Sequence, residues 1–124
     1  MKPHRTPLAS VKIFQGAHEL TVRRLKRRDD SFTLHYTISP PLPDAENDTP
    51  VLLMIEAVDD AGNEYPDWGG AYGTADDGTH TDGSISARPA LAAEAREVHI
   101  RITFLRGGEE HPCDLTLRTT KTGP

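Results

Sequence analysis

The chain has 124 residues, a formal net charge of −5 and a hydrophobic fraction of 35%. This length suits one domain with its own core, and the mild acidity argues against general affinity for nucleic acid, which needs a basic face. The single cysteine, Cys113, excludes an internal disulfide and a cysteine-based zinc cluster.

The chain begins with residues 1–10, which lack the apolar core of a signal peptide. No later run approaches the roughly 20 apolar residues that span a bilayer. We therefore expect a soluble, cytoplasmic protein without a membrane span, or an extracytoplasmic one if a leader has been removed. We expect residues 1–10 and 120–124 to be flexible tails around one domain at 11–119.

Alternation of apolar and polar residues predicts strands from the first part of the domain. Val11–Phe14 is a short candidate strand, and Phe32–Ser39 alternates throughout. The turn-forming residues 29–31 predict a β-hairpin between His18–Arg28 and Phe32–Ser39. The alternation loses phase near Arg23, which indicates a bulge or a strand end.

The middle of the chain combines turns with one apolar run. Pro40–Pro50 holds four prolines and predicts a solvated loop. Val51–Val58 is mostly apolar, which predicts a central strand buried on both faces. Asp59–Asn63 predicts a turn, with a short return strand at Glu64–Trp68. We expect Gly69–Arg88 to be a long loop with one strand near Ser84–Ala87.

The last third predicts a second hairpin. Val98–Phe104 has the strongest alternation in the chain, and Cys113–Arg118 supplies its partner after the turn signal Gly107–Gly108. Leu91–Arg96 is the one stretch of good helix formers, long enough for about one and a half turns. About seven strands joined by turns predict an all-β, two-sheet antiparallel sandwich.

Residues 59–82 are the best candidate for a functional segment. They hold seven acidic residues and no Lys or Arg, together with five of the ten glycines, the only Trp and two of the three Tyr. The rest of the chain is therefore slightly basic. Long loops in compact domains are commonly functional or mobile, so this segment is where we place a binding site.

Three pieces of sequence resemble a known family. They are Val-Asp-Asp-Ala-Gly-Asn-Glu-Tyr at 58–65, Gly-Gly-Ala-Tyr-Gly at 69–73 and the Arg-Pro-Ala-Leu strand start in 88–102. This order resembles bacterial immunoglobulin-like β-sandwich domains of unassigned function. The resemblance implies an immunoglobulin-like sandwich of about seven strands with a binding or structural role, and it transfers no catalytic residue.

The candidate binding residues combine aromatic and acidic side chains. Aromatic rings suit interface anchors and also stack on sugars, while carboxylates accept hydrogen bonds from polar ligands. The alternative is that Tyr65 and Trp68 cap the core. We predict a contact with another protein, or with a glycan, through Tyr65, Trp68, Tyr72, Asp76, Asp77 and Asp82.

A calcium site is the main alternative use of the same segment. Calcium takes hard oxygen ligands, which two acidic clusters could supply if they met at one end of the sandwich. No register fits an EF-hand loop, and Asp and Asn also form turns by bonding their own backbone. We therefore name no metal ligand and no cofactor.

Two further features have ordinary structural explanations. The basic run Arg23–Arg28 could meet an acidic partner or phosphate, but charges also protect an edge strand against pairing. Cys113 shares a face with Leu115 and Leu117, which predicts a buried thiol. The six histidines have no metal-binding or catalytic spacing. The sequence therefore predicts a non-catalytic binding or interaction module that uses residues 59–82.

Overall fold

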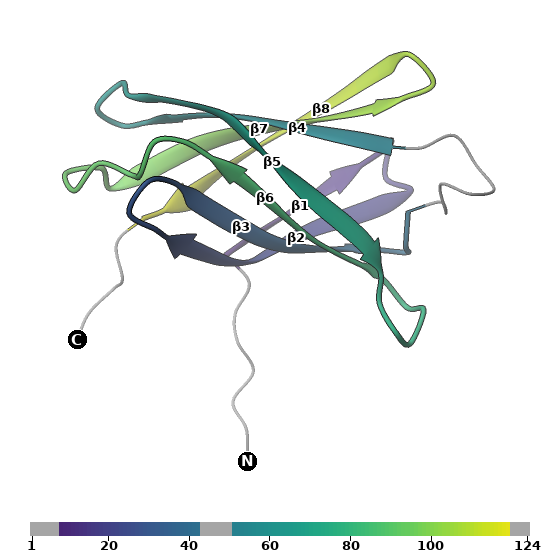
Figure 1. Cartoon of the computed structure of the whole chain (residues 1–124). Coiled ribbons are helices and arrows are strands. Elements are labelled where there is room, and N and C mark those ends of the chain that lie inside the picture. Colours follow the sequence, from purple (N-terminus) through teal and green to yellow (C-terminus); the bar gives the residue numbers. More distant parts are fainter. Residues whose placement is uncertain (1–7, 43–50, 120–124) are drawn as a thin grey trace.

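The computed structural model describes residues 8–42 and 51–119 as an all-β fold with antiparallel pairing throughout (Figure 1). Residues 1–7, 43–50 and 120–124 lie outside the described residues. They include most of the predicted N-terminal tail, most of the proline-rich loop Pro40–Pro50 and the predicted C-terminal tail. The strands are β1 (Ala9–Ile13), β2 (His18–Arg27), β3 (Phe32–Ser39), β4 (Val51–Asp59), β5 (Glu64–Thr74), β6 (Thr81–Ala87), β7 (Glu97–Arg106) and β8 (Glu109–Arg118).

The strands form one continuous, strongly curled sheet. Their order is β1-β2-β3-β6-β5-β4-β7-β8, and β1 packs against β8, so the sheet nearly closes into a barrel. Figure 1 shows β5 running diagonally between the layer that contains β4 and the layer that contains β6. The strand β5 therefore joins the two layers, and the core lies between them.

Period-two alternation builds this core. Alternate residues of most strands face inward, and the largest fully buried side chains come from seven strands: Tyr65, Phe32, Phe104, Leu20, Leu34, Ile38, Ile55, Ile85, Ile100, Ile102, Leu117 and Val22. Cys113 lies on the inner face beside Leu115 and Leu117, as predicted, and burial raises the pKa of its thiol to about 11.

Both predicted hairpins are present. The strands β2 and β3 pair with a register shift between Val22 and Arg24, which confirms the bulge at Arg23. The strands β7 and β8 turn at Gly107 and Gly108, both with positive φ, but β8 begins earlier than predicted, at Glu109. The stretch Leu91–Arg96 is a turn and not a helix.

The prediction that Val51–Val58 is buried on both faces was wrong. The strand β4 is central in hydrogen-bonding order, but the curled sheet has only one interior, so alternate side chains of β4 point outward. Leu52 is 61% exposed, and Met54 and Val58 are also exposed. The outer face of β4 therefore carries apolar side chains that the core does not use.

The prediction of a long loop at Gly69–Arg88 was also wrong, because β5 and β6 form a hairpin. The strand expected near Ser84–Ala87 is present as the last part of β6. The glycines of this segment led to the prediction of a loop, but two of them are needed for packing inside the strands. A Cβ at Gly70 would collide with the backbone of Ser84, and the ring of Tyr36 occupies the space where a Cβ would stand at Gly83. These glycines permit close packing inside strands and do not form turns.

Candidate interaction site

The segment 59–82 consists of one turn, the strand β5 and a second turn at 75–80 that leads into β6. At about 3.3 Å per residue, the eleven residues of β5 hold the two turns roughly 35 Å apart. The two acidic clusters therefore do not meet at one end of the fold, as the calcium alternative requires. Within the described residues, no group of three or more His, Cys, Asp and Glu side chains is placed to hold a metal ion.

The first turn is closed around the buried carboxylate of Asp59. Its oxygens accept hydrogen bonds from the backbone N–H groups of Ala61 and Asn63, the Asn63 amide and the Tyr65 hydroxyl, at 2.7–2.9 Å. Desolvation opposes ionisation, but the hydrogen bonds outweigh it and lower the pKa of Asp59 to about 2. This acidic residue serves the fold.

Tyr65 also belongs to the core and not to a binding surface. Only 2% of it is exposed, and its ring meets Phe32 edge-on at 5.5 Å between centroids. Its hydroxyl donates to Asp59 and accepts a bond from the N–H of Ala92 at 3.0 Å. The prediction that Tyr65 contacts a partner was wrong, because the side chain ties the first turn to the 88–96 segment.

Trp68 is displayed on a β-bulge. The register shifts between Asp67 and Gly69, and the Asp67 carboxylate bonds the N–H groups of Gly69 and Ile55 at 2.6 and 2.9 Å. The bulge leaves Trp68 57% exposed, with the guanidinium of Arg88 3.8 Å from its ring centroid. Trp68 therefore does not cap the core.

Tyr72 lies at the line where β4 and β5 separate. The ring is half-buried, and its hydroxyl donates to the carbonyl of Val51 at 2.5 Å. Beside it is an open pocket of about 270 Å³. The lining is largely apolar and comes from four strands: Tyr36, Val51, Leu52, Leu53, Gly70, Ala71, Tyr72, Ser84 and Ile85.

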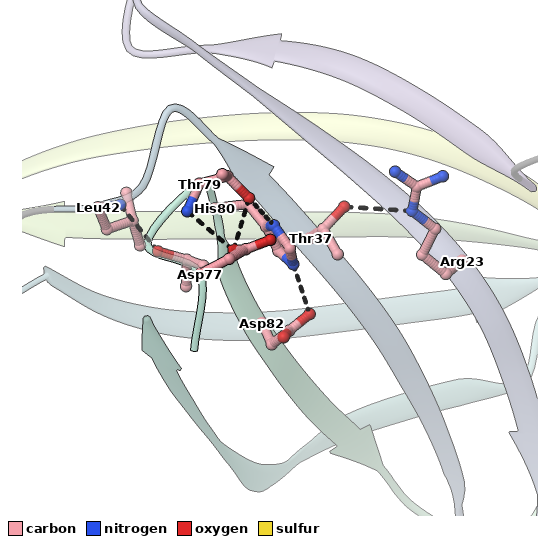
Figure 2. A network of polar contacts seen from close by, with 8 residues as sticks. Arg23, Thr37, Leu42, Asp77, Thr79, His80 and Asp82 are labelled. Carbon is pink, nitrogen blue, oxygen red and sulfur yellow. Dashed lines mark hydrogen bonds and ion pairs between the residues drawn. The ribbon is translucent and has the colours of Figure 1, made fainter. Parts of the chain in front are cut away.

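The remaining predicted acids lie in the second turn and in the first part of β6, where Figure 2 shows Asp77 and Asp82. Asp77 accepts bonds from the N–H and hydroxyl of Thr79 at 3.0 and 2.8 Å, which lower the pKa of its carboxyl. His80 contacts Thr79 and lies 3.3 Å from the carboxylate of Asp82. Asp76, Asp77 and Asp82 are all exposed. The acids at this end of β5 remain accessible.

The outer face beside this turn was missed by the sequence reasoning. Arg23 donates from Nε to the Thr37 hydroxyl at 3.2 Å, and Figure 2 shows this pair across the face from Asp82. A shallow hollow of about 370 Å³ lies here, lined by Arg23, His35, Tyr36, Thr37, Ala71, Asp82, Gly83 and Ser84. Only pairing of β2, β3, β6 and β5 assembles these residues, which are scattered in the sequence.

The pKa of His35 reflects the positive charge on this face. Burial lowers the pKa of its imidazole, and the neighbouring cations Arg24, Lys26 and Arg28 lower it further. These cations belong to the predicted basic run. In the described residues, β1 pairs with β2 only over residues 18–22, so the basic half of β2 pairs with β3 alone.

Comparison with known proteins identifies the fold and no more. No family model matches the chain, and no curated protein matches its sequence. A DUF4426 family protein from Pseudomonas aeruginosa is similar in structure, with a TM-score of 0.54 and 7% identity over 91% of this chain and 100% of that one. A conserved domain protein from Bacillus anthracis has a TM-score of 0.54 and 14% identity over 83% of this chain. The match spans 44% of that protein.

Within the described residues, no helix is long and apolar enough to cross a membrane.

Proposed function

We propose that this chain is a non-catalytic protein-interaction module and that the β5–β6 hairpin is its contact surface. The observation that carries the proposal is the exposed Trp68, held on a bulge, on a hairpin that also displays Asp76, Asp77 and Asp82. Tryptophan is a favoured interface anchor. The turn between β5 and β6 projects from the end of the sheet (Figure 1), so a folded partner can reach it.

Charge supports a partner with basic groups. From Glu64 to Ala87 the hairpin has five acidic residues and no Lys or Arg. Complementary charge speeds association and selects partners. We also propose that the fold belongs with immunoglobulin-like sandwiches, in which loops and edges commonly serve recognition.

The polar cluster at the second turn gives little support to catalysis. Thr79, His80 and Asp82 place a hydroxyl, an imidazole and a carboxylate in a row. The Thr79 hydroxyl, however, donates to Asp77, so His80 does not receive its proton. Thr79 and His80 lie on the turn and Asp82 lies in β6, and we assign the three groups to shaping this end of the hairpin.

The calcium-dependent or carbohydrate-binding alternative has less support than a protein partner. The Asp59 carboxylate already accepts hydrogen bonds within its own turn, and it lies at the opposite end of β5 from Asp77 and Asp82. Arg88 covers one face of Trp68, so a sugar ring would stack only on the other. Thermal melting with millimolar calcium and Trp68 fluorescence against a glycan panel test these alternatives.

Site-specific photocrosslinking in cells tests the proposed function. A photoreactive residue replaces Trp68 in one variant and Thr116, exposed on β8, in a control. We expect a discrete protein adduct from position 68 alone. The purified partner should bind Trp68→Ala about tenfold more weakly or worse, as for an interface anchor. Equal crosslinking from both positions, or no adduct from position 68, would contradict the proposal.

A further inference from the structure

The seam between β4 and β5 is a gap in the sheet. The two strands pair only at Glu56–Pro66, Ala57–Tyr65 and Val58–Glu64. Beyond this point β5 turns away to pair with β6 from Asp67 onward (Figure 1). Toward Val51 and Thr74, therefore, neither strand has a partner strand on the seam side among residues 8–42 and 51–119.

Hydrogen bonds identify which backbone groups of β4 face the seam. Asp59 donates its N–H to Asn63, Ile55 donates its N–H to the Asp67 carboxylate, and the Val51 carbonyl accepts from Tyr72. Successive residues of a strand direct their backbone groups to opposite edges, so the odd-numbered positions face the seam. The peptide groups of Leu53 therefore point into it, and within the described residues no partner is present for them.

The same alternation identifies the open groups of β5. Ala75 donates its N–H to the His80 carbonyl at 2.9 Å, so the odd positions from Gly69 onward face β6. The N–H and C=O groups of Gly70, Tyr72 and Thr74 then face the seam. In residues 8–42 and 51–119, no strand pairs with residues 67–74 of β5 on that side.

Among the described residues, the seam therefore combines unpaired strand edges with an apolar lining. Leu53, Gly70 and Tyr72 all line the pocket of about 270 Å³, and Leu52 is exposed at its rim. Gly70 and Ala71 are small, so another backbone can come close to β5. An unpaired strand edge is a template for an incoming strand, and a flanking pocket gives that strand side-chain specificity.

We propose that an extended, basic peptide segment of the protein partner adds to the seam edge of β5 as an extra strand. This inference rests on the proposed function and names the partner's chemistry. The backbone of the segment bonds Gly70, Tyr72 and Thr74, and small apolar side chains at alternate positions enter the pocket. Its Lys or Arg residues meet Asp76 and Asp77 at the hairpin tip.

A second copy of this chain fits the seam less well. The basic run lies in β2, where residues 24–27 are already paired with β3. One edge of that segment is open, but the segment stays attached to β3, so a second copy would have to bring its whole sheet to the seam. An extended segment of another protein would not. Charge and availability together therefore favour a segment from another protein.

Selection of peptides by the full chain tests the proposal. A displayed library of random decapeptides is panned against the protein. The enriched sequences are then synthesised with one backbone N-methyl group, placed at each position in turn. We expect basic sequences with alternating small apolar residues. N-methylation at alternate positions, either the odd or the even ones, should lower affinity about tenfold or more, because those N–H groups bond to β5. N-methylation at the positions between them should lower affinity much less.

A protein variant provides the matched control. Thr74→Pro removes one seam-facing N–H and leaves the β5–β6 ladder its own bonds, whereas Thr74→Val retains the N–H. Thr74→Pro should weaken the selected peptides about tenfold, and Thr74→Val should bind as wild type. If Thr74→Pro fails to fold, the N-methylation test still decides.

Several results would overturn the proposal. They are the enrichment of no peptide, an equal loss of affinity from N-methylation at odd and even positions, and a preference for acidic sequences. A further one is an NMR titration in which the peptide leaves the amide signals of Leu53, Gly70 and Tyr72 unshifted. A dimer that protects those amides would replace the peptide with a second copy. Photocrosslinking at position 68 without peptide enrichment would retain the proposed function and reject only the added strand.

Discussion

The two ends of β5 have similar composition and opposite roles. At one end Asp59 is buried and accepts four hydrogen bonds, and Tyr65 closes the turn from the core side. At the other end Asp76, Asp77 and Asp82 are exposed, and Trp68 stands on the strand between. The acidic and aromatic side chains thus stabilise the fold at the first end, whereas Trp68 and the acids of the second end remain accessible.

The difference shows that composition alone does not locate a binding surface. An acid that accepts several hydrogen bonds inside a turn is unavailable to a ligand, whereas an acid on a projecting turn stays accessible. The cause is position in the sheet: the first turn lies against Phe32 and the 88–96 segment, and the second turn extends beyond the core.

Replacing one hydrogen-bonded acid in each turn tests the comparison most strongly. Asp59→Ala leaves two backbone N–H groups, the Asn63 amide and the Tyr65 hydroxyl without their acceptor, so we expect Tm to fall by roughly 10 °C. Asp77→Ala removes bonds to Thr79 alone and should change Tm by roughly 2 °C or less. Equal losses in thermal melts would show that the turns are equivalent.

The pH dependence of stability gives a second test of the first turn. The pKa of folded Asp59 is about 2, below its ordinary value of 3.8, so its contribution is complete above that ordinary value and is lost as pH falls toward 2. Wild type should lose Tm over this range more steeply than Asp59→Ala. The Tm of Asp59→Ala should still fall with pH, because the pKa values of Asp77 and Asp114 are also lowered in the folded protein. Parallel curves would contradict the assignment.

The two tyrosine hydroxyls compare the closed turn with the seam. Tyr65→Phe removes a buried bond to a carboxylate and should cost about 1–3 kcal/mol in denaturant unfolding. Tyr72→Phe removes a half-buried bond to the Val51 carbonyl and should cost about 0.5–1.5 kcal/mol. Tyr65→Phe should leave binding of the partner unchanged. A larger loss from Tyr72→Phe would mean that the seam is the better-ordered region.

The smallest expected effect concerns Trp68. Arg88→Ala removes an exposed cation–π contact and should cost about 0.5–1 kcal/mol. Trp68 is the only tryptophan, so its fluorescence reports the loss directly. Arg118→Ala on β8 serves as the control and should leave emission unchanged. Identical spectra for Arg88→Ala and wild type would mean that the pair does not persist in solution.

Much of the fold could be predicted because alternation is a local property. The β2–β3 and β7–β8 hairpins, the bulge at Arg23 and the buried Cys113 follow from side chains that alternate along one strand. The β5–β6 hairpin was missed because Gly70 and Gly83 lie where other parts of the chain leave no room for a Cβ. A local pattern cannot report the position of a distant ring or carbonyl.

The candidate site was predicted only in part for the same reason. The sequence by itself determined that residues 59–82 concentrate acidic and aromatic side chains and that the chain folds from alternating strands. Tertiary structure decided that Tyr65 and Asp59 are buried, that Trp68 and the acids at 76–82 are exposed, and that β4 and β5 separate into a seam. Burial and free strand edges depend on which strands become neighbours, and long-range pairing sets those neighbours.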